Sequence, residues 1–232
     1  MRSRSTGLLI GLLLAAAPRI LAAGDAWKPT LASFDGEVKV KTPGDADFRD
    51  ARKGEPLPEG TVIKTAARSE ARVSVDAGSL LELEANTELT LSNERKNESF
   101  FSLALGTMLA KFKALTKDQA FQVRASNSVA AIRGTEFAVW GDPHESKVGV
   151  FDEGRVEVAQ PDGKGAIALG PGQETDVAPE SAPSAPHKLV LFKGLRKRLK
   201  ELRRLAAEQD KDERRDQERQ ERRERREEPR GR

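Results

Sequence analysis

The stretch of sequence that decides the fold of this chain runs Phe121-Gln122-Val123-Arg124-Ala125-Ser126-Asn127-Ser128-Val129-Ala130-Ala131-Ile132-Arg133-Gly134-Thr135-Glu136-Phe137-Ala138-Val139-Trp140. Apolar side chains occupy every second position from Phe121 to Ala125, and a period of two returns from Thr135 to Val139. Successive side chains of a strand point to opposite faces, so this alternation is typical of a strand buried on one face. The stretch therefore predicts two half-buried strands in close succession.

A corner is expected between these strands, at Ile132-Arg133-Gly134-Thr135. Gly134 can adopt a positive φ, so the chain can bend sharply after Arg133. The Arg133 guanidinium carries several donors in a rigid fork, which suits loop carbonyls or a carboxylate such as Glu136 or Glu153. We interpret Arg133, Gly134 and Thr135 first as a structural corner. The alternative is that Arg133 binds a carboxylate of a ligand or partner.

Short alternating runs continue on both sides of this stretch, from Phe34 to Val177, and glycines separate them. Many short strands with turn residues between them indicate an all-β domain, a sandwich or a roll. A β-solenoid is the structural alternative, because Arg72-Val73-Ser74-Val75 faintly resembles Lys147-Val148-Gly149-Val150. One similarity between two segments does not establish a repeat.

Two local expectations follow from the alternation. Glu82 and Glu84 alternate with Leu81 and Leu83, which predicts that both carboxylates lie on a solvated outer face. Gly106 separates two apolar runs and is expected to form a turn between them.

An ordered set of motifs resembles the FecR domain over residues 34–178. The motifs are Leu57-Pro58-Glu59-Gly60-Thr61-Val62-Ile63-Lys64-Thr65, Ser69-Glu70-Ala71-Arg72-Val73, Gly78-Ser79-Leu80-Leu81-Glu82-Leu83, Ile132-Arg133-Gly134-Thr135-Glu136-Phe137, Val148-Gly149-Val150, Gly154-Arg155-Val156-Glu157-Val158 and Gly172-Gln173. The resemblance implies a jelly-roll-like β-sandwich. It also implies a domain outside the cytoplasmic membrane that serves signalling or envelope-associated recognition, with sigma-factor regulation in the founding arrangement. The chain departs from that arrangement, because neither a cytoplasmic regulatory segment nor an internal membrane-spanning helix is expected, so any sensory role would pass through a partner.

The N-terminus has the organisation of a secretory signal peptide. Arg2 and Arg4 precede an uncharged run from Gly7 to Ala17, and the small residues 22–24 follow. The apolar run is too short to span a bilayer. We therefore expect a cleavable signal over residues 1–23, an N-terminal segment over 24–33, and a periplasmic or secreted mature protein.

Charge and cysteine content narrow the functional classes. Residues 196–232 contain 16 Lys or Arg and 11 Asp or Glu, and residues 1–23 add three arginines, whereas the whole chain is +3. Residues 24–195 are therefore net acidic, which argues against nucleic-acid binding by the core. The chain has no cysteine, so it forms no disulfide and has no thiol nucleophile.

The C-terminal part divides into three segments. Residues 179–188 form a proline-rich linker, and residues 189–208 are predicted to be an amphipathic basic helix. Its apolar stripe contains Leu195, Leu199, Leu202 and Leu205, which are candidate contacts to a partner, to a second copy or to an anionic membrane surface. The stripe is too short for a long coiled coil. Residues 209–232 are expected to be a charged tail, helical or disordered.

The residue types required for catalysis are sparse. Asp142, His144, Glu145 and Ser146 fall in one tight turn, where consecutive side chains do not converge as a catalytic triad requires. Their spacing also differs from known metal sites. We therefore expect no catalytic residues, no metal and no cofactor.

The remaining expectation is binding. Trp140 precedes a turn and could form part of a recognition surface, although a position at the edge of the core explains it equally well. The sequence thus predicts a non-catalytic exported FecR-like binding protein with an envelope protein as partner. The alternative is a carbohydrate or cell-wall binding module, against which the small number of aromatic residues argues.

Overall fold

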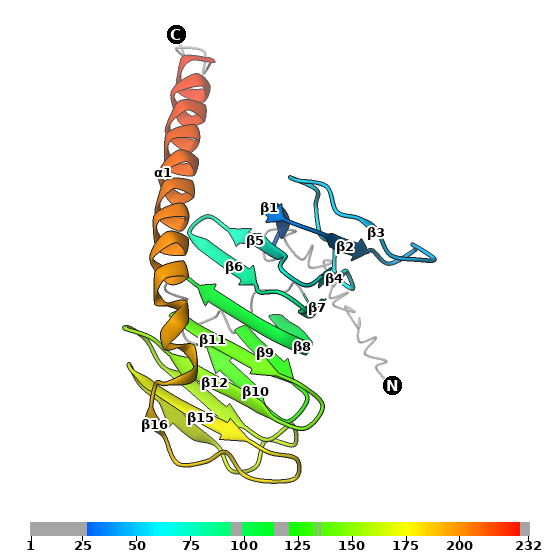
Figure 1. Cartoon of the computed structure of the whole chain (residues 1–232). Helices are drawn as coiled ribbons and strands as arrows, with labels where there is room; N and C mark the ends of the chain where they lie inside the picture. The colour runs from blue at the N-terminus through cyan, green and yellow to red at the C-terminus, as the bar shows by residue number, and fades with distance from the viewer. Residues whose placement is uncertain (1–26, 94–98, 114–120, 133, 135, 228–232) are drawn as a thin grey trace, which may run out of the picture.

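The strands expected from the alternation are present, and a long helix follows them (Figure 1). The computed structural model describes residues 27–93, 99–113, 121–132, 134 and 136–227. The predicted signal peptide and the last five residues of the tail lie outside this range. The strands are β1 Thr30–Asp35, β2 Val38–Lys41, β3 Arg49–Asp50, β4 Val62–Thr65, β5 Glu70–Asp76, β6 Ser79–Leu83, β7 Glu88–Asn93, β8 Ser99–Lys111, β9 Phe121–Ala125, β10 Val129–Ile132, β11 Glu136–Gly141, β12 Ser146–Val150, β13 Val156–Ala159, β14 Ile167–Leu169, β15 Gln173–Val177 and β16 His187–Lys188. The 3₁₀ helix η1 Leu191–Leu195 leads directly into α1 Arg196–Glu227.

The strands form two layers that share β8. The first half of β8 pairs with β7 and β9, and its second half pairs with β6 and β11. The helix-side sheet has the order β1-β5-β6-β8-β11-β12-β15-β16. The far sheet has the order β3-β2-β4-β7-β8-β9-β10-β13-β14. The predicted all-β fold with a C-terminal helix is confirmed, and the strands lie in a sandwich, not in the coils of a solenoid.

The change of sheet occurs at Gly106, where the sequence predicted a turn. Gly106 has a φ of +94°. A Cβ atom there would lie 2.6 Å from Thr87 Cα and 2.7 Å from the Asn86 carbonyl oxygen, so only glycine fits without displacing that backbone. The strand therefore bends and continues, and the predicted turn is wrong.

The main core lies between the two sheets. Five aromatic rings meet at its centre: Trp27, Phe101, Phe112, Phe121 and Phe137. Phe101 and Phe121 pack edge to face with ring centroids 4.8 Å apart. Full burial of a large apolar side chain contributes about 1.5–3 kcal/mol, so this cluster is a major source of sandwich stability.

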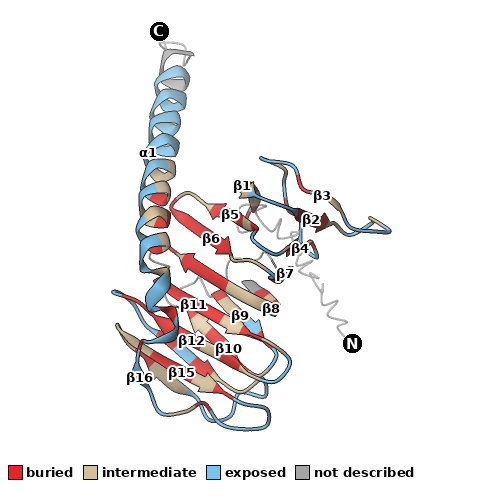
Figure 2. Cartoon of the chain, viewed as in Figure 1, coloured by how far each residue is buried: buried red, intermediate tan, exposed pale blue. Residues whose placement is uncertain are grey.

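The helix α1 forms a third layer over the helix-side sheet. Its first half carries a buried stripe toward the sheet, whereas its second half extends past the sandwich and is exposed from Lys211 to Arg223 (Figures 1 and 2). Ion pairs one helical turn apart support the exposed part, among them Arg214 with Asp210. The charged tail is thus helical through Glu227.

The proline-rich segment 179–188 lies against the sandwich. Its last two residues form β16, which pairs with β15. The Thr175 hydroxyl donates a hydrogen bond to the Ser184 carbonyl oxygen at 2.8 Å. This segment therefore holds the entry to η1 and α1 close to the edge of the helix-side sheet.

Candidate functional site

The corner predicted around Arg133 takes the chain from one sheet to the other. β10 belongs to the far sheet and ends at Ile132, while β11 belongs to the helix-side sheet and begins at Glu136. Gly134 lies between them with a φ of +61°, consistent with the expected bend. Arg133 and Thr135 lie outside the described residues.

The acid that follows the corner is bound by the helix. Glu136 is 2% exposed and accepts a hydrogen bond from Arg203 Nε at 2.5 Å, and a second one from Arg203 Nη2. Lys111 Nζ lies 3.6 Å from the same carboxylate. Glu153, the other acid suggested for Arg133, accepts a hydrogen bond from Lys111 at 2.6 Å.

The leucine stripe of α1 packs against the chain's own sheet. Leu199, Leu202 and Ala206 are buried, and Leu195 and Leu205 are half-buried beside them. Their apolar neighbours are Leu80, Leu109 and Ala138 of the helix-side sheet, together with Phe151, which directly follows β12. The sandwich therefore covers the leucine stripe that the sequence indicated as a candidate contact to a partner, a second copy or a membrane.

Arg198 binds a cluster of carboxylates next to this stripe. Its Nε donates to Glu82 Oε1 at 2.6 Å, its Nη1 donates to Glu84 Oε2 at 2.5 Å, and its Nη2 contacts Glu70. Glu82 is fully buried, so the prediction that Glu82 and Glu84 face solvent is wrong. The physical reason is that α1 covers the outer face of β6.

Burial acts strongly on these two acids. It raises the pKa of Glu82 and, together with the charge of Glu82, raises the pKa of Glu84 to about 7, whereas Arg72 acts in the opposite direction on both. Arg72 Nε donates to Glu82 Oε2 at 2.6 Å. The Arg198 contacts also favour the ionised carboxylates. Arg72 of β5 and Arg198 of α1 thus both pair with the buried Glu82 carboxylate.

Asp152 forms a second attachment point for the helix. It accepts hydrogen bonds from Arg196 at 2.6 Å and from Arg203 at 2.7 Å. Hydrogen bonds from these two arginines lower the pKa of Asp152. We call the contacts of Arg196, Arg198 and Arg203 with the sandwich the arginine clasps. The sequence pattern pointed to the leucines of this seam but not to the arginines beside them.

Trp140 lies where η1 meets the sheet. It is half-buried and packs against the apolar contacts under the helix. A cavity of about 320 Å³ there is lined by Trp140, Thr107, Glu84, Ala85, Leu191, Phe192 and Leu195. Gly149 makes room for this junction, because a Cβ atom would lie 2.5 Å from Phe192 and 2.6 Å from Leu189.

The turn with Asp142 and His144 has a local structural role. Asp142 Oδ1 accepts hydrogen bonds from the backbone N–H groups of His144 and Glu145, both at 2.7 Å. The carboxylate therefore stabilises the turn itself. Within the described ranges, no group of three His, Asp or Glu side chains could hold a metal ion.

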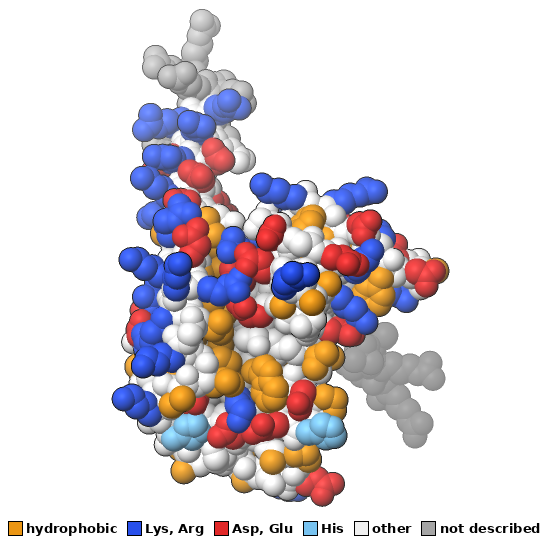
Figure 3. All heavy atoms as spheres, in the orientation of Figure 1, with side chains coloured by type: hydrophobic (Ala, Val, Ile, Leu, Met, Phe, Trp, Pro, Cys, Tyr) orange, Lys and Arg blue, Asp and Glu red, His pale blue; other side chains and the backbone are white. Residues whose placement is uncertain are grey.

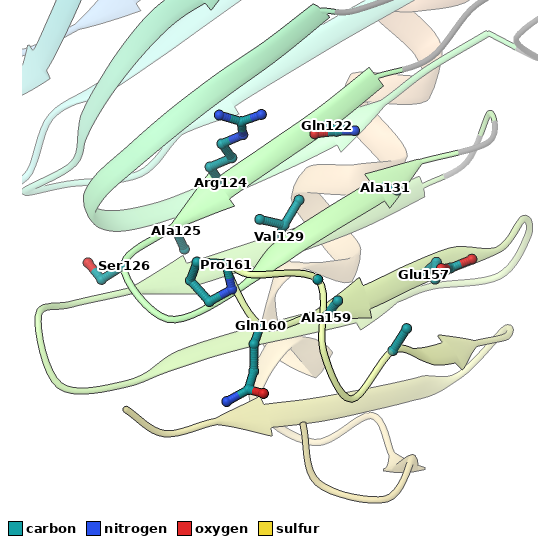
Figure 4. Close-up of a pocket in the computed structure, with 12 residues that line it drawn as sticks. Gln122, Arg124, Ala125, Ser126, Val129, Ala131, Glu157, Ala159, Gln160 and Pro161 are labelled. Atoms are coloured by element: carbon teal, nitrogen blue, oxygen red, sulfur yellow. The ribbon is translucent and has the colours of Figure 1, made fainter. Parts of the chain in front are cut away.

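A second cavity lies on the outer face of the far sheet, away from α1. It has a volume of about 500 Å³ and is formed by β9, β10, β13 and the loop that follows β13 (Figure 4). The lining residues are Gln122, Arg124, Ala125, Ser126, Val129, Ala131, Glu157, Ala159, Gln160, Pro161, Gly163 and Ala166. The sequence did not single out this face, because its residues alternate with core residues as on any solvated sheet.

These features define a two-layer β-sandwich module that carries a helix clasped to one face. The model of the family described as FecR protein matches the central part of this chain, residues 61–157. The resemblance predicted from motifs is confirmed over that range. The sandwich is longer than the match, since its strands begin at Thr30 and end at Lys188.

Comparison with solved structures finds partial matches at low sequence identity. Two crystal structures of a candidate anti-sigma factor from Parabacteroides distasonis each align with a TM-score of 0.49 and 18% identity. Each alignment covers 57% of this chain and 62% of that protein. Among curated proteins, none matches the chain. None of the helices in the described part of the chain is long and apolar enough to cross a membrane.

Proposed function

We propose that this is a non-catalytic binding protein of the bacterial envelope, exported by the signal peptide of residues 1–23, that acts in signalling by recognising a protein partner. The observation that supports this most strongly is the FecR domain at residues 61–157. In the arrangement that the family resemblance implies, such a domain lies outside the cytoplasmic membrane and contributes recognition. The absence of converged catalytic side chains around His144 fits this role.

The partner would contact the exposed part of α1. The arginine clasps and the buried leucines fix the first half of the helix, so the second half is held at a defined angle to the sandwich. Basic side chains follow the outer edge of α1 along its length (Figure 3). Such a surface favours a partner with an acidic face.

Deletion of the exposed helix tests this proposal. A chain that ends at Asp210 keeps the leucine packing, the arginine clasps and the 2.8 Å contact of Lys113 with Asp210. We expect the full-length chain to retain one envelope protein from a membrane-protein extract, and the shortened chain to lose it. Because the contact is electrostatic, retention should weaken as salt is raised. A Lys41→Gln, Lys64→Gln variant, altered on the far sheet, is the matched control and should retain the partner.

Export can be tested separately. We expect the mature protein in the periplasmic or secreted fraction, with an N-terminus that begins near residue 24. Mass spectrometry of the N-terminal peptide measures this. A cytosolic protein that still carries residues 1–23 would contradict the export part of the proposal.

Glycan binding is the second candidate function, and the open cavity on the far sheet is the observation that favours it. Its volume of about 500 Å³ suits a small ligand. None of its lining residues is aromatic, however, so it lacks the ring faces on which sugars stack. Saturable co-sedimentation with peptidoglycan that survives deletion of residues 189–232 would favour this function over protein recognition.

A further inference from the structure

We propose that the cavity on the outer face of the far sheet binds a short peptide in extended form, with its carboxylate at Arg124 and its ammonium group at Glu157. This site is separate from α1, and a ligand there would be additional to the partner proposed for the helix. Three features support this site: the strand register, the spacing of the two charged residues along the sheet, and the small side chains between them.

The register of three strands places the lining residues in two rows. Ala131 of β10 lies opposite Gln122 of β9 and opposite Glu157 of β13. In the neighbouring row on the same face, Val129 is paired in the same way with Arg124 and with Ala159. Arg124 and Glu157 therefore occupy diagonal corners of one face, and Figure 4 shows them at opposite ends of the cavity.

The diagonal matches the length of a short peptide. Strands β9 and β13 are two strand spacings apart and the rows are two residues apart, so the Cα atoms of the two corners are separated by about 12 Å. An extended chain spans about 3.3–3.6 Å per residue, so a tripeptide spans about 10–11 Å. Its two charged ends would reach a cation on one side and an acid on the other.

The floor between the charges suits a peptide backbone. Ala131 and Ala159 leave it low, so a backbone can approach the sheet. Gln122 and Gln160 each offer an amide that can both donate to and accept from a peptide group. The lining thus provides partners for peptide amides and charges but no ring for a sugar.

The wall of the cavity is held in place. Gln160 N–H donates to the Lys164 carbonyl oxygen at 3.0 Å, and Gly163 N–H donates to the Gln160 carbonyl oxygen at 2.8 Å. A Cβ atom on Gly165 would lie 2.8 Å from Ala182, so this loop packs tightly against the proline-rich segment. A wall fixed by its own contacts does not have to be ordered when a ligand binds.

Calorimetry with three forms of one peptide tests the assignment of both ends. The probes are trialanine, N-acetyl-trialanine, which lacks the ammonium group, and trialanine amide, which lacks the carboxylate. We expect the full-length chain to bind trialanine about three- to tenfold more tightly than either blocked form, since each blocked form loses one charge-assisted hydrogen bond that solvent partly weakens. Absence of saturable binding of trialanine, or equal binding of all three forms, would overturn the proposal.

Two variants separate the two ends. Glu157→Gln should remove the preference for trialanine over its acetylated form and keep the preference over the amide, and Arg124→Gln should do the reverse. Glu88→Gln, on the outer face of β7 in the same sheet, is the matched control and should change neither preference. If a chito-oligosaccharide binds this chain and competes with trialanine while both variants leave peptide binding unchanged, the site is a glycan site and the peptide proposal is wrong.

Discussion

The buried Glu82 makes Arg198 a side chain of α1 with a large expected effect on stability. Arg198→Ala removes one partner from Glu82 and one from Glu84, while Arg72 remains at 2.6 Å from Glu82. Leaving a buried acceptor poorly paired costs about 1–3 kcal/mol. We expect a loss of that size in urea unfolding. Lys197→Ala, its exposed neighbour, should change the free energy of unfolding by less than about 0.5 kcal/mol. Equal effects of the two substitutions would contradict the clasp.

The sequence could not predict this cluster. The alternation with Leu81 and Leu83 correctly identified the core face of β6, but it left the other face open. Whether Glu82 meets water or a helix depends on Arg198, which is 116 residues away in the chain. Local pattern carries no information about such a contact, so the more common arrangement, a solvated acid, was predicted and proved wrong.

His187 gives β16 a pH dependence. A hydrogen bond from its Nε2 to Asp176, at 3.0 Å, raises the pKa of the imidazole above its ordinary value. A raised pKa in the folded state means that the contact stabilises β16 at pH below about 6.5 and is lost as pH rises through the folded-state pKa. The Leu189 N–H directly after β16 donates to the Gly172 carbonyl oxygen at 2.8 Å, so its amide exchange, corrected for the intrinsic effect of pH, should become faster as the imidazole loses its proton. In Asp176→Asn, NMR titration should show a lower His187 pKa; an unchanged pKa would refute this assignment.

At the scale of elements, the junction between β12 and η1 depends on the absence of a side chain at Gly149. Gly149→Ala would place a Cβ atom 2.5 Å from Phe192 and force η1 away from the sheet. Overpacking of this kind costs about 1–3 kcal/mol. Gly170→Ala is the matched control, because its nearest neighbour would be Gln173 at 3.5 Å. Chemical denaturation and amide exchange along α1 measure both, and faster exchange in α1 is expected for Gly149→Ala but not for the control.

The elements themselves were largely predictable, whereas their arrangement was not. Strand positions follow from the period of two, as the burial of alternate residues in β5 shows. The same period does not say which sheet a strand joins, so β8 was divided into two strands at Gly106. The helix was expected from the leucine spacing, but its extension to Glu227 depends on ion pairs that the charged sequence allows without requiring.

At the scale of the whole molecule, three layers depend on one another. The far sheet and the helix-side sheet share the aromatic core, and α1 covers a face that would otherwise expose leucines beside buried acids. The two candidate binding surfaces lie on opposite sides of this stack, one on the exposed helix and one on the far sheet. A ligand on the far sheet would therefore leave α1 accessible to a partner.

The layered arrangement predicts that two deletions of α1 have very different effects. A chain that ends at Asp210 lacks the exposed stretch from Lys211 to Arg223 and the residues after it, and it should unfold with a free energy within about 0.5 kcal/mol of the full-length value. A chain that ends at Lys188 uncovers Leu80, Leu109 and Phe151, and it removes Arg198 from Glu82 and Arg203 from Glu136. Breaking buried ion pairs costs about 3–5 kcal/mol, so this chain should be less stable by at least that amount.

Urea unfolding and binding of a dye that reports exposed apolar surface measure both deletions. The chain ending at Asp210 should bind no more dye than the full-length protein, while the chain ending at Lys188 should bind distinctly more, because the face of the helix-side sheet loses its cover. If instead the chain ending at Lys188 is as stable as the full-length protein, then α1 does not form part of the folded unit. In that case its leucines are available to a partner, as the sequence first indicated.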